Sequence, residues 1–185
     1  MSNIILGVTG SIAVYKAADL ANALTKKGHA VSVIMTKNAM EFVTPLTFET
    51  LARRPVYSDA FERVDDFDVE HISLAKQADV LVIAPATANF IGKAAAGIAD
   101  DLLTTVVMAA FGKPALICPA MNTVMYENPV VQMNIKKLAD LGYRFVEPRE
   151  SILACGDLGK GALAEINVIL AETESLLIQA GARKV

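Results

Sequence analysis

The sequence predicts an α/β fold: a single doubly wound domain, Rossmann-like or flavodoxin-like, built on a parallel sheet. Three observations support this prediction. Short apolar runs, typical of strands buried on both faces, recur along the 185 residues. Segments with helical spacing of apolar residues separate these runs. Polar or glycine-containing turns follow several of the runs, and ligands of open α/β sheets bind in the loops at the carboxyl ends of the strands.

Composition excludes several function classes. Hydrophobic residues make up 54% of the chain and the mean hydropathy is +0.42, yet no apolar run approaches the length that spans a bilayer. This apolar excess predicts burial between subunits, and therefore a homo-oligomer rather than a membrane protein. The net charge of −3 and the lack of a basic tract argue against nucleic acid as a partner.

Cysteine and histidine are scarce. Cys118 and Cys155 are too few for a disulfide framework, and they fit a reducing compartment. Met1-Ser2-Asn3 leads straight into the first expected strand without a basic signal region, so we expect a cytoplasmic protein. His29 and His71 are the only histidines, and no Cys/His cluster has zinc spacing, so we expect no metal.

The first strand and turn indicate an anion site. Residues 3–8 are typical of a buried strand, and a helix is expected over about 12–27. Thr9-Gly10-Ser11 forms the turn between them, where free backbone N–H groups and the helix dipole favour a phosphate. Ser11 stands where an N-cap or a phosphate-binding hydroxyl would stand; a capped structural turn is the alternative. The dinucleotide spacing G-x-G-x-x-G is absent, which favours a mononucleotide phosphate over a pyrophosphate.

The second and third strands also end in polar turns. Residues 30–35 form the second expected strand, which ends in the polar tip Thr36-Lys37-Asn38 and is preceded by His29, expected on the surface. The third, over 79–84, leads into Pro85-Ala86-Thr87-Ala88-Asn89-Phe90. Small residues in this turn would let a planar ligand lie close to the backbone, while Thr87 and Asn89 supply hydrogen bonds.

Two helices near the third strand leave questions open. A short helix before it carries His71, and a lone histidine is more often a structural group than a catalytic one, so both roles remain possible. The helix expected over 102–111 is apolar on nearly every side, which indicates burial at a subunit interface.

The stretch 114–129 is the most informative part of the chain. A fourth buried strand over 115–118 breaks at Pro119 and delivers Met121, Asn122 and Met125 into an expected loop. The Asn122 amide can hold a carboxylate or the edge of a flat heterocycle. The alternative is a connection whose methionines only fill the core. Cys118, inside the strand, is expected in the core.

The last third of the chain completes the pattern. We expect a helix over 130–141, a strand over 143–146 and a closing helix over 165–180. Between the strand and the closing helix, Gly156, Gly159 and Gly161 predict a flexible flap.

Five motifs together resemble the homo-oligomeric flavin-containing cysteine decarboxylases, over nearly the whole chain. The likeness is greatest to the members that convert 4′-phosphopantothenoylcysteine to 4′-phosphopantetheine in coenzyme A synthesis. One departure is Tyr126, which stands where the family motif usually has Trp. The motifs, in order, are Thr9-Gly10-Ser11-Ile12-Ala13, His71, Pro85-Ala86-Thr87-Ala88-Asn89, Pro119-Ala120-Met121-Asn122-Thr123-Val124-Met125 and Ala154-Cys155-Gly156-Asp157.

The resemblance implies a bound FMN and a small-molecule cysteinyl substrate. The FMN phosphate would lie at Gly10, Ser11 and Ile12. The other implied cofactor contacts are Thr36, Lys37, Asn38, Thr87, Ala88, Asn89, Phe90 and Ala120. Asn122 would hold the substrate carboxylate, and the further implied substrate contacts are Met125, Ile152, Leu153 and Ala154.

The resemblance also implies the chemistry and the assembly. The cysteinyl group is transiently oxidised to a thioaldehyde, carbon dioxide leaves, and the enethiol is reduced again. His71 would act as acid/base, and Cys155 would donate a proton from a substrate-covering flap at about 148–164 of a single domain, 1–185. Family members assemble as trimers, some further into dodecamers. A separate synthetase would supply the substrate.

Four alternatives remain. Peptidyl-cysteine decarboxylases of lantibiotic synthesis share the histidine and the Met-Asn motif but stop at the enethiol, and Cys155 counts against them. Flavin prenyltransferases lack that motif, so Asn122 counts against these. Non-catalytic flavin-binding regulatory proteins usually carry long acidic extensions. A flavodoxin-like electron carrier would need neither His71 nor Cys155.

Overall fold

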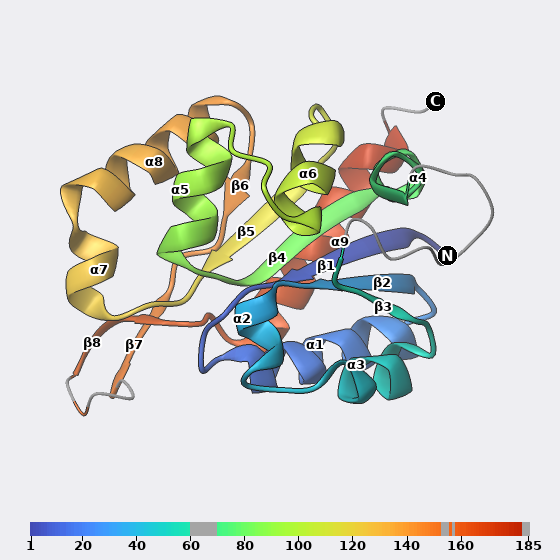
Figure 1. The fold of residues 1–185 in the computed structure, drawn as a ribbon, viewed down its shortest axis with the longest axis horizontal. Coiled ribbons are helices and arrows are strands. Elements are labelled where there is room, and N and C mark those ends of the chain that lie inside the picture. The colour runs from blue at the N-terminus through green and yellow to red at the C-terminus, as the bar shows by residue number, and fades with distance from the viewer. Residues whose placement is uncertain (60–69, 153–155, 157, 183–185) are drawn as a thin grey trace.

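A six-stranded sheet forms the centre of the computed structural model, which describes residues 1–59, 70–152, 156 and 158–182 (Figure 1). Its strands are β1 (Asn3–Val8), β2 (Ala30–Met35), β3 (Val56–Tyr57), β4 (Val80–Ala86), β5 (Ala115–Pro119) and β6 (Arg144–Phe145). They pair in parallel in the order β3-β2-β1-β4-β5-β6. This is the Rossmann order, and without the two-residue β3 it is the flavodoxin order. The expected α/β fold with a parallel sheet is confirmed.

Helices cover both faces of the sheet (Figure 1). One face packs against α1 (Val14–Lys26), α3 (Pro45–Ala52) and α9 (Ile166–Ala182). The other packs against α4 (Glu70–Gln77), α5 (Ala88–Ala96), α6 (Leu102–Ala109) and α8 (Pro129–Asp140). Two short helices, α2 (Lys37–Met40) and α7 (Thr123–Glu127), follow β2 and β5.

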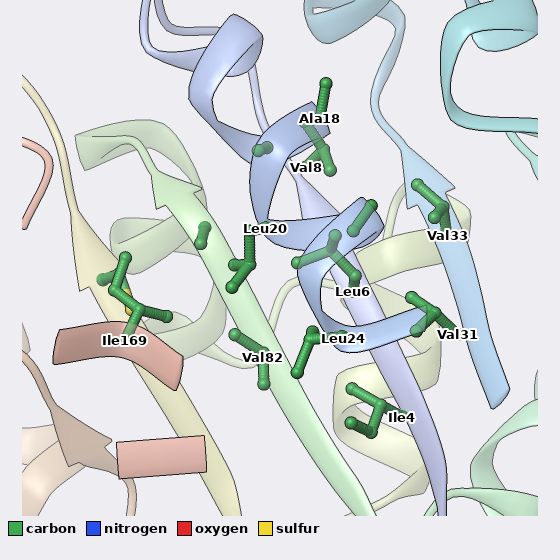
Figure 2. Close-up of a cluster of buried hydrophobic side chains, with 14 of the residues drawn as sticks. Ile4, Leu6, Val8, Ala18, Leu20, Leu24, Val31, Val33, Val82 and Ile169 are labelled. Carbon is green, nitrogen blue, oxygen red and sulfur yellow. The ribbon is translucent and has the colours of Figure 1, made fainter. Parts of the chain in front are cut away.

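Burial on both faces explains why the strands are apolar throughout. Along β1, Ile4, Leu6 and Val8 enter the cluster beneath α1 and α9, as Figure 2 shows, while Ile5 enters the cluster on the other face. Consecutive side chains of a strand point to opposite faces, so a strand covered twice needs apolar residues at every position. From Ile4 to Val8 the residues of β1 are almost completely buried, and this core holds the loops at the carboxyl edge in place.

Capping residues set the helix starts near that edge. The Thr87 hydroxyl accepts a hydrogen bond from the Phe90 amide and begins α5. Asp101 begins α6 in a capping box, accepting from the Thr104 amide at 2.8 Å while the Thr104 hydroxyl bonds back to the Asp101 backbone.

The structure corrects the expected start of the first helix. The helix α1 begins at Val14 rather than Ile12, and its N-cap position is Ala13, which offers no capping side chain. Ser11 instead accepts a hydrogen bond from the Ala13 amide inside the preceding turn, at 3.3 Å. The Ser11 hydroxyl therefore stabilises the connection between β1 and α1 and does not cap the helix. Residues 9–13 form this connection, and α1 begins only after it.

The range of the expected flap contains an antiparallel hairpin, formed by β7 (Arg149–Ile152) and β8 (Leu158–Ala162), and its flexibility stays a prediction. Two further expectations were wrong. Met125 lies in α7 and not in a loop, since Asn122 caps that helix through its side-chain oxygen. His29 is not a surface residue, because its side chain is only 11% exposed and its Nε2 lies 3.1 Å from Glu174 Oε1 on α9.

Most apolar side chains of α6 are buried within this chain, so fewer of them can lie in a subunit interface than the sequence indicates. Leu102, Leu103, Val106 and Val107 are buried within this chain and pack on the sheet. Only Met108, and Phe111 just beyond the helix, leave large apolar groups exposed on this segment. Cys118 is fully buried in the core as expected, and burial raises the pKa of its thiol. No helix in the described ranges is both long and apolar enough to cross a membrane.

Candidate active site

A cavity of about 1020 Å³ lies at the carboxyl edge of the sheet. Its walls come from the segments that follow β1, β2, β4 and β5, from the far part of α5 and the start of α6, and from the β7–β8 hairpin. Parallel strands bring their carboxyl ends to one edge, so residues as far apart in the sequence as Thr9 and Leu163 meet here. The location is the one in which open α/β sheets bind ligands.

Thr9 ties together the two strands at which the chain order reverses. Its buried hydroxyl donates to the Pro85 carbonyl at 2.8 Å and accepts from the Thr87 amide at 3.0 Å. The Thr9 amide bonds the same carbonyl at 3.3 Å. These bonds fix the turn after β1 against the turn after β4, so the floor of the cavity is rigid.

Gly10 is required by a close approach between two turns. A Cβ at this position would lie 2.4 Å from Asn38 Cβ, far inside van der Waals contact. The turn after β1 and the start of α2 therefore touch through backbone, and both line the cavity. Any larger residue at Gly10 would push Asn38 out of the wall or displace the turn.

The turn after β1 has the properties of a phosphate site. Within the described part of the chain, the amides of Gly10 and Ile12 donate to no protein acceptor. Lys16 and Lys37 also line the cavity, and neither has an ion-pair partner among the described residues. Free amides beside two unpaired cations can bind a phosphate monoester.

The turn after β4 forms a closely packed wall with small side chains. Thr87, Ala88, Asn89 and Phe90 all line the cavity, and Ala120 faces them from the end of β5. The Ala120 amide donates to the Ala86 carbonyl at 3.0 Å, which holds the two segments together. Alanine at two of these positions leaves room for a planar ring beside the backbone.

Asn122 is held in a fixed orientation at the cavity wall. Its Oδ1 accepts from the Val124 amide at 2.9 Å, the capping bond of α7. Met125, one turn further on, lines the same wall and is half exposed. The donors of this side chain are on its NH2 group.

The hairpin is docked tightly against the segment that carries Asn122. The Met121 amide donates to the Gly161 carbonyl at 3.0 Å. A Cβ at Gly161 would lie 2.1 Å from the Met121 carbonyl oxygen, and one at Gly159 would lie 2.3 Å from Thr123 Oγ1. Both positions in β8 therefore need glycine for packing.

Tyr126 reinforces this contact. The ring is nearly buried, and its hydroxyl donates to Glu147 Oε2 at 3.2 Å. Lys160, on β8, pairs with Glu147 and lies over the Tyr126 ring, 5.7 Å from its centroid. Burial, and then Glu147, raise the pKa of Tyr126, while Lys160 lowers the pKa of Glu147. These three residues form the brace between α7 and the hairpin.

A second charged group lies on the opposite wall. Lys93 pairs with Asp100 at 2.7 Å and with Asp101 at 3.4 Å. Asp100 raises the pKa of Lys93, and Lys93 in turn lowers the pKa of Asp100. Because the charge of Lys93 is already balanced, it offers less to an anionic ligand than Lys16 or Lys37.

Most of the site residues expected from the sequence meet in this cavity. Those that line it are Gly10, Ser11, Ile12, Thr36, Lys37, Asn38, Thr87, Ala88, Asn89, Phe90, Ala120, Asn122, Met125 and Ile152. Leu153, Ala154 and Cys155 lie outside the described residues. Sequence reasoning assigned no role to Thr9 or Arg149, which also line the cavity. The sequence contains a signal for Thr9, because a hydroxyl residue stands directly before Gly10 at the end of a strand. It contains no comparable signal for Arg149.

His71 does not join the others within one chain. It lies in the first turn of α4, which packs against α6, and it does not line the cavity. In Figure 1, α4 and α7 lie at opposite ends of the molecule. A catalytic role for His71 therefore requires another way of bringing it to the site.

The chain belongs to the Flavoprotein family, whose model matches residues 1–177. A probable phosphopantothenoylcysteine decarboxylase of Streptococcus mutans is 48% identical over 175 residues, which cover 94% of this chain and 98% of that protein. The Coenzyme A biosynthesis bifunctional protein CoaBC of Bacillus subtilis is 52% identical over 163 residues. That match covers 88% of this chain but 40% of the bifunctional protein.

Solved structures share the whole fold. The FMN-dependent cysteine decarboxylase SpaF superposes with a TM-score of 0.86 and 34% identity, over 98% of each chain. A mutant PPC decarboxylase complexed with pantothenoylaminoethenethiol superposes with a TM-score of 0.82 and 33% identity, over 94% of this chain and 96% of that one.

The brace predicts a specific loss of stability. Replacing Tyr126 with Phe should lower the free energy of unfolding by about 1 kcal/mol near neutral pH, because a nearly buried hydrogen bond to a carboxylate is lost. The lowered pKa of Glu147 means that its ion pair stabilises the fold above the ordinary glutamate pKa and is lost as the pH falls. Urea unfolding measures this, with the exposed Tyr15→Phe variant as the matched control. Equal stabilities of the two variants would contradict the brace.

Proposed function

We propose that this protein decarboxylates 4′-phosphopantothenoylcysteine to 4′-phosphopantetheine, a step of coenzyme A synthesis, with FMN as its cofactor. One observation carries the proposal: a single cavity gathers the turn at Gly10, the wall at Ala88 and Ala120, and the Asn122 segment. The Streptococcus mutans relative, matched over almost its full length, supports the choice of substrate.

The residues present fit FMN. The amides of Gly10 and Ile12, with Lys16 and Lys37, would hold its phosphate. Thr36 and Asn38 would border the cofactor, and Ala88 and Ala120 would leave room for the ring. The Gly10–Asn38 approach supports this assignment, since a side chain at position 10 would fill the cradle.

FMN, when bound, supplies the reversible two-electron oxidation of the cysteinyl thiol that gives the departing carboxylate an electron sink. The side chains hold the substrate for it. The neutral amide of Asn122 suits the carboxylate, because a cation there would stabilise the ground state and oppose the loss of carbon dioxide. The hairpin would cover the substrate and exclude water. Cys155, beyond the end of β7, would donate the proton that completes the product.

The role proposed for His71 needs a second copy of the chain. Its helix lies away from the cavity in one chain, so we propose a homo-oligomer in which His71 of one subunit completes the site of another. Exposed apolar side chains on the same side of the sheet support an interface there. They include Ile72 beside His71, Ile98, Met108, Phe111, Val130 and Met133.

A second candidate is a cysteine decarboxylase that acts on peptides. The similarity to SpaF, an FMN-dependent cysteine decarboxylase, favours it as far as the fold is concerned. The higher identity to the Streptococcus mutans protein and the presence of Cys155 favour the smaller substrate.

Turnover tests the proposal directly. The purified holoenzyme, incubated without oxygen with phosphopantothenoylcysteine, should release one carbon dioxide per molecule, and the product mass should show no net oxidation. A peptide ending in cysteine should react far more slowly. Turnover of the peptide alone would favour the second candidate, and turnover of neither would refute the proposed function.

Asn122→Asp separates the two roles of this side chain. The aspartate keeps an oxygen that caps α7, but it loses the NH2 donor and adds a negative charge beside the substrate carboxylate. We expect kcat/KM to fall by about 100-fold with FMN content unchanged. The matched control is Asn128→Asp, because Asn128 caps α8 in the same way, accepting from the Val130 amide at 2.9 Å. Loss of FMN in Asn122→Asp alone would instead make Asn122 a cofactor ligand.

Cys155→Ser tests the proton donor. The variant should still release carbon dioxide but, in a single turnover, yield the enethiol product, two hydrogen atoms lighter than the saturated thiol, with the two electrons left on the cofactor. Mass analysis of the quenched reaction distinguishes the two products. Formation of the saturated thiol at the wild-type rate would refute the role of Cys155.

Mixing inactive variants tests the shared site. His71→Ala and Asn122→Asp should each have little activity, but hybrid trimers that contain both variants should recover about a third of the wild-type activity, since one of their three shared sites combines the two intact residues. Co-expression with two different affinity tags isolates the hybrids. Hybrids as inactive as the separate variants would place His71 and Asn122 in the same chain's site, or His71 outside catalysis.

A further inference from the structure

Four cationic side chains line the cavity, and their environments differ. They are Lys16, Lys37, Lys93 and Arg149. Lys93 is neutralised by two carboxylates, and Lys16 and Lys37 flank the turn after β1, where one phosphate would bind. Arg149 stands apart from all three, because it comes from the β7–β8 hairpin.

The Arg149 guanidinium is incompletely paired. Its Nε lies 3.0 Å from Glu165 Oε1, an ion-pair distance. The N–H does not point at that oxygen, so this buried atom makes no hydrogen bond to the described protein. An arginine carries five N–H donors, and a carboxylate at one edge leaves the other donors for a second anion.

The hairpin holds Arg149 at a defined position. Arg149 pairs across the ladder with Ala162, and the ladder is bulged next to it because Gly161 faces Met121 instead. A bulge re-aims the neighbouring side chains of a strand. Ser151, two residues along β7, also lines the cavity and adds a hydroxyl to the same wall.

We propose that Arg149 is a phosphate-binding residue of the cavity and recognises a phosphate monoester. The inference rests on the proposed function, in which the cavity takes two such groups, one on the cofactor and one on the substrate. A guanidinium beside a single exposed carboxylate suits a doubly charged phosphate, which can accept two parallel hydrogen bonds from it. The turn at Gly10 provides one phosphate site, and Arg149 provides a second group of donors.

A purely structural role makes a different prediction. If Arg149 served only to tie β7 to Glu165 at the start of α9, then Glu165→Gln and Arg149→Met would have the same effects. If Arg149 binds phosphate, the two variants have different effects on phosphate binding, because Glu165→Gln leaves the guanidinium in the cavity. Arg149→Lys keeps the positive charge but loses the paired N–H donors. Its phosphate binding should therefore be weaker than that of wild type and stronger than that of Arg149→Met.

The experiment compares the holoenzymes of these variants with wild type in three measurements. The first is the rate of FMN release on dilution, followed by flavin fluorescence. The second is the ratio of KM values for phosphopantothenoylcysteine and its dephosphorylated form. The third is the rise in melting temperature caused by inorganic phosphate, which does not depend on turnover.

The outcomes identify the source of the phosphate. A KM ratio that changes by about 10-fold to 100-fold in Arg149→Met, with Glu165→Gln unchanged, assigns Arg149 to the substrate phosphate. FMN release accelerated by a similar factor, with the KM ratio unchanged, assigns it to the cofactor phosphate. If Arg149→Met and Glu165→Gln match in all three measurements, the proposal is overturned. Failure of the wild type to turn over substrate refutes the proposed function, while FMN release and the phosphate effect still decide the role of Arg149.

Discussion

The cavity depends on one constraint, the join between two neighbouring strands that send the chain to opposite faces of the sheet. After β1 the chain enters α1, and after β4 it enters α5, on the other face. The buried Thr9 hydroxyl bonds the backbone of both turns, at Pro85 and at Thr87. Because these hydrogen bonds hold the two turns together, the pocket between the turns is preformed and does not depend on ligand binding.

Close backbone packing shapes the rest of the cavity from this point. Gly10 brings the start of α2 against the first turn, and Gly161 brings the hairpin against Met121. The side chains that line the cavity are thereby attached to segments that are packed against one another. His71, which has a proposed role in catalysis, lies on a helix away from the cavity, so that role requires a second subunit.

Local patterns in the sequence were enough to predict β1, β2, β4, β5 and β6, the turn at Gly10 and the position of Asn122, because each depends on consecutive residues. The two-residue strand β3 was not predicted. The hairpin could not be predicted, since its glycines pack against Met121 and Thr123, far away in the sequence. Arg149 was missed for the same reason. Tyr126, expected only as a replacement for Trp, proved to use its hydroxyl to bond Glu147.

FMN binding by the wild-type protein tests the central claim, that this edge of the sheet is a preformed flavin mononucleotide site. The absorbance spectrum of the purified protein gives the stoichiometry, and fluorescence titration compares FMN with riboflavin. We expect one FMN per chain and an affinity for FMN at least about tenfold above that for riboflavin, because the proposed site at Gly10 would bind the phosphate. A chain that binds no flavin, or binds the two equally, would contradict it.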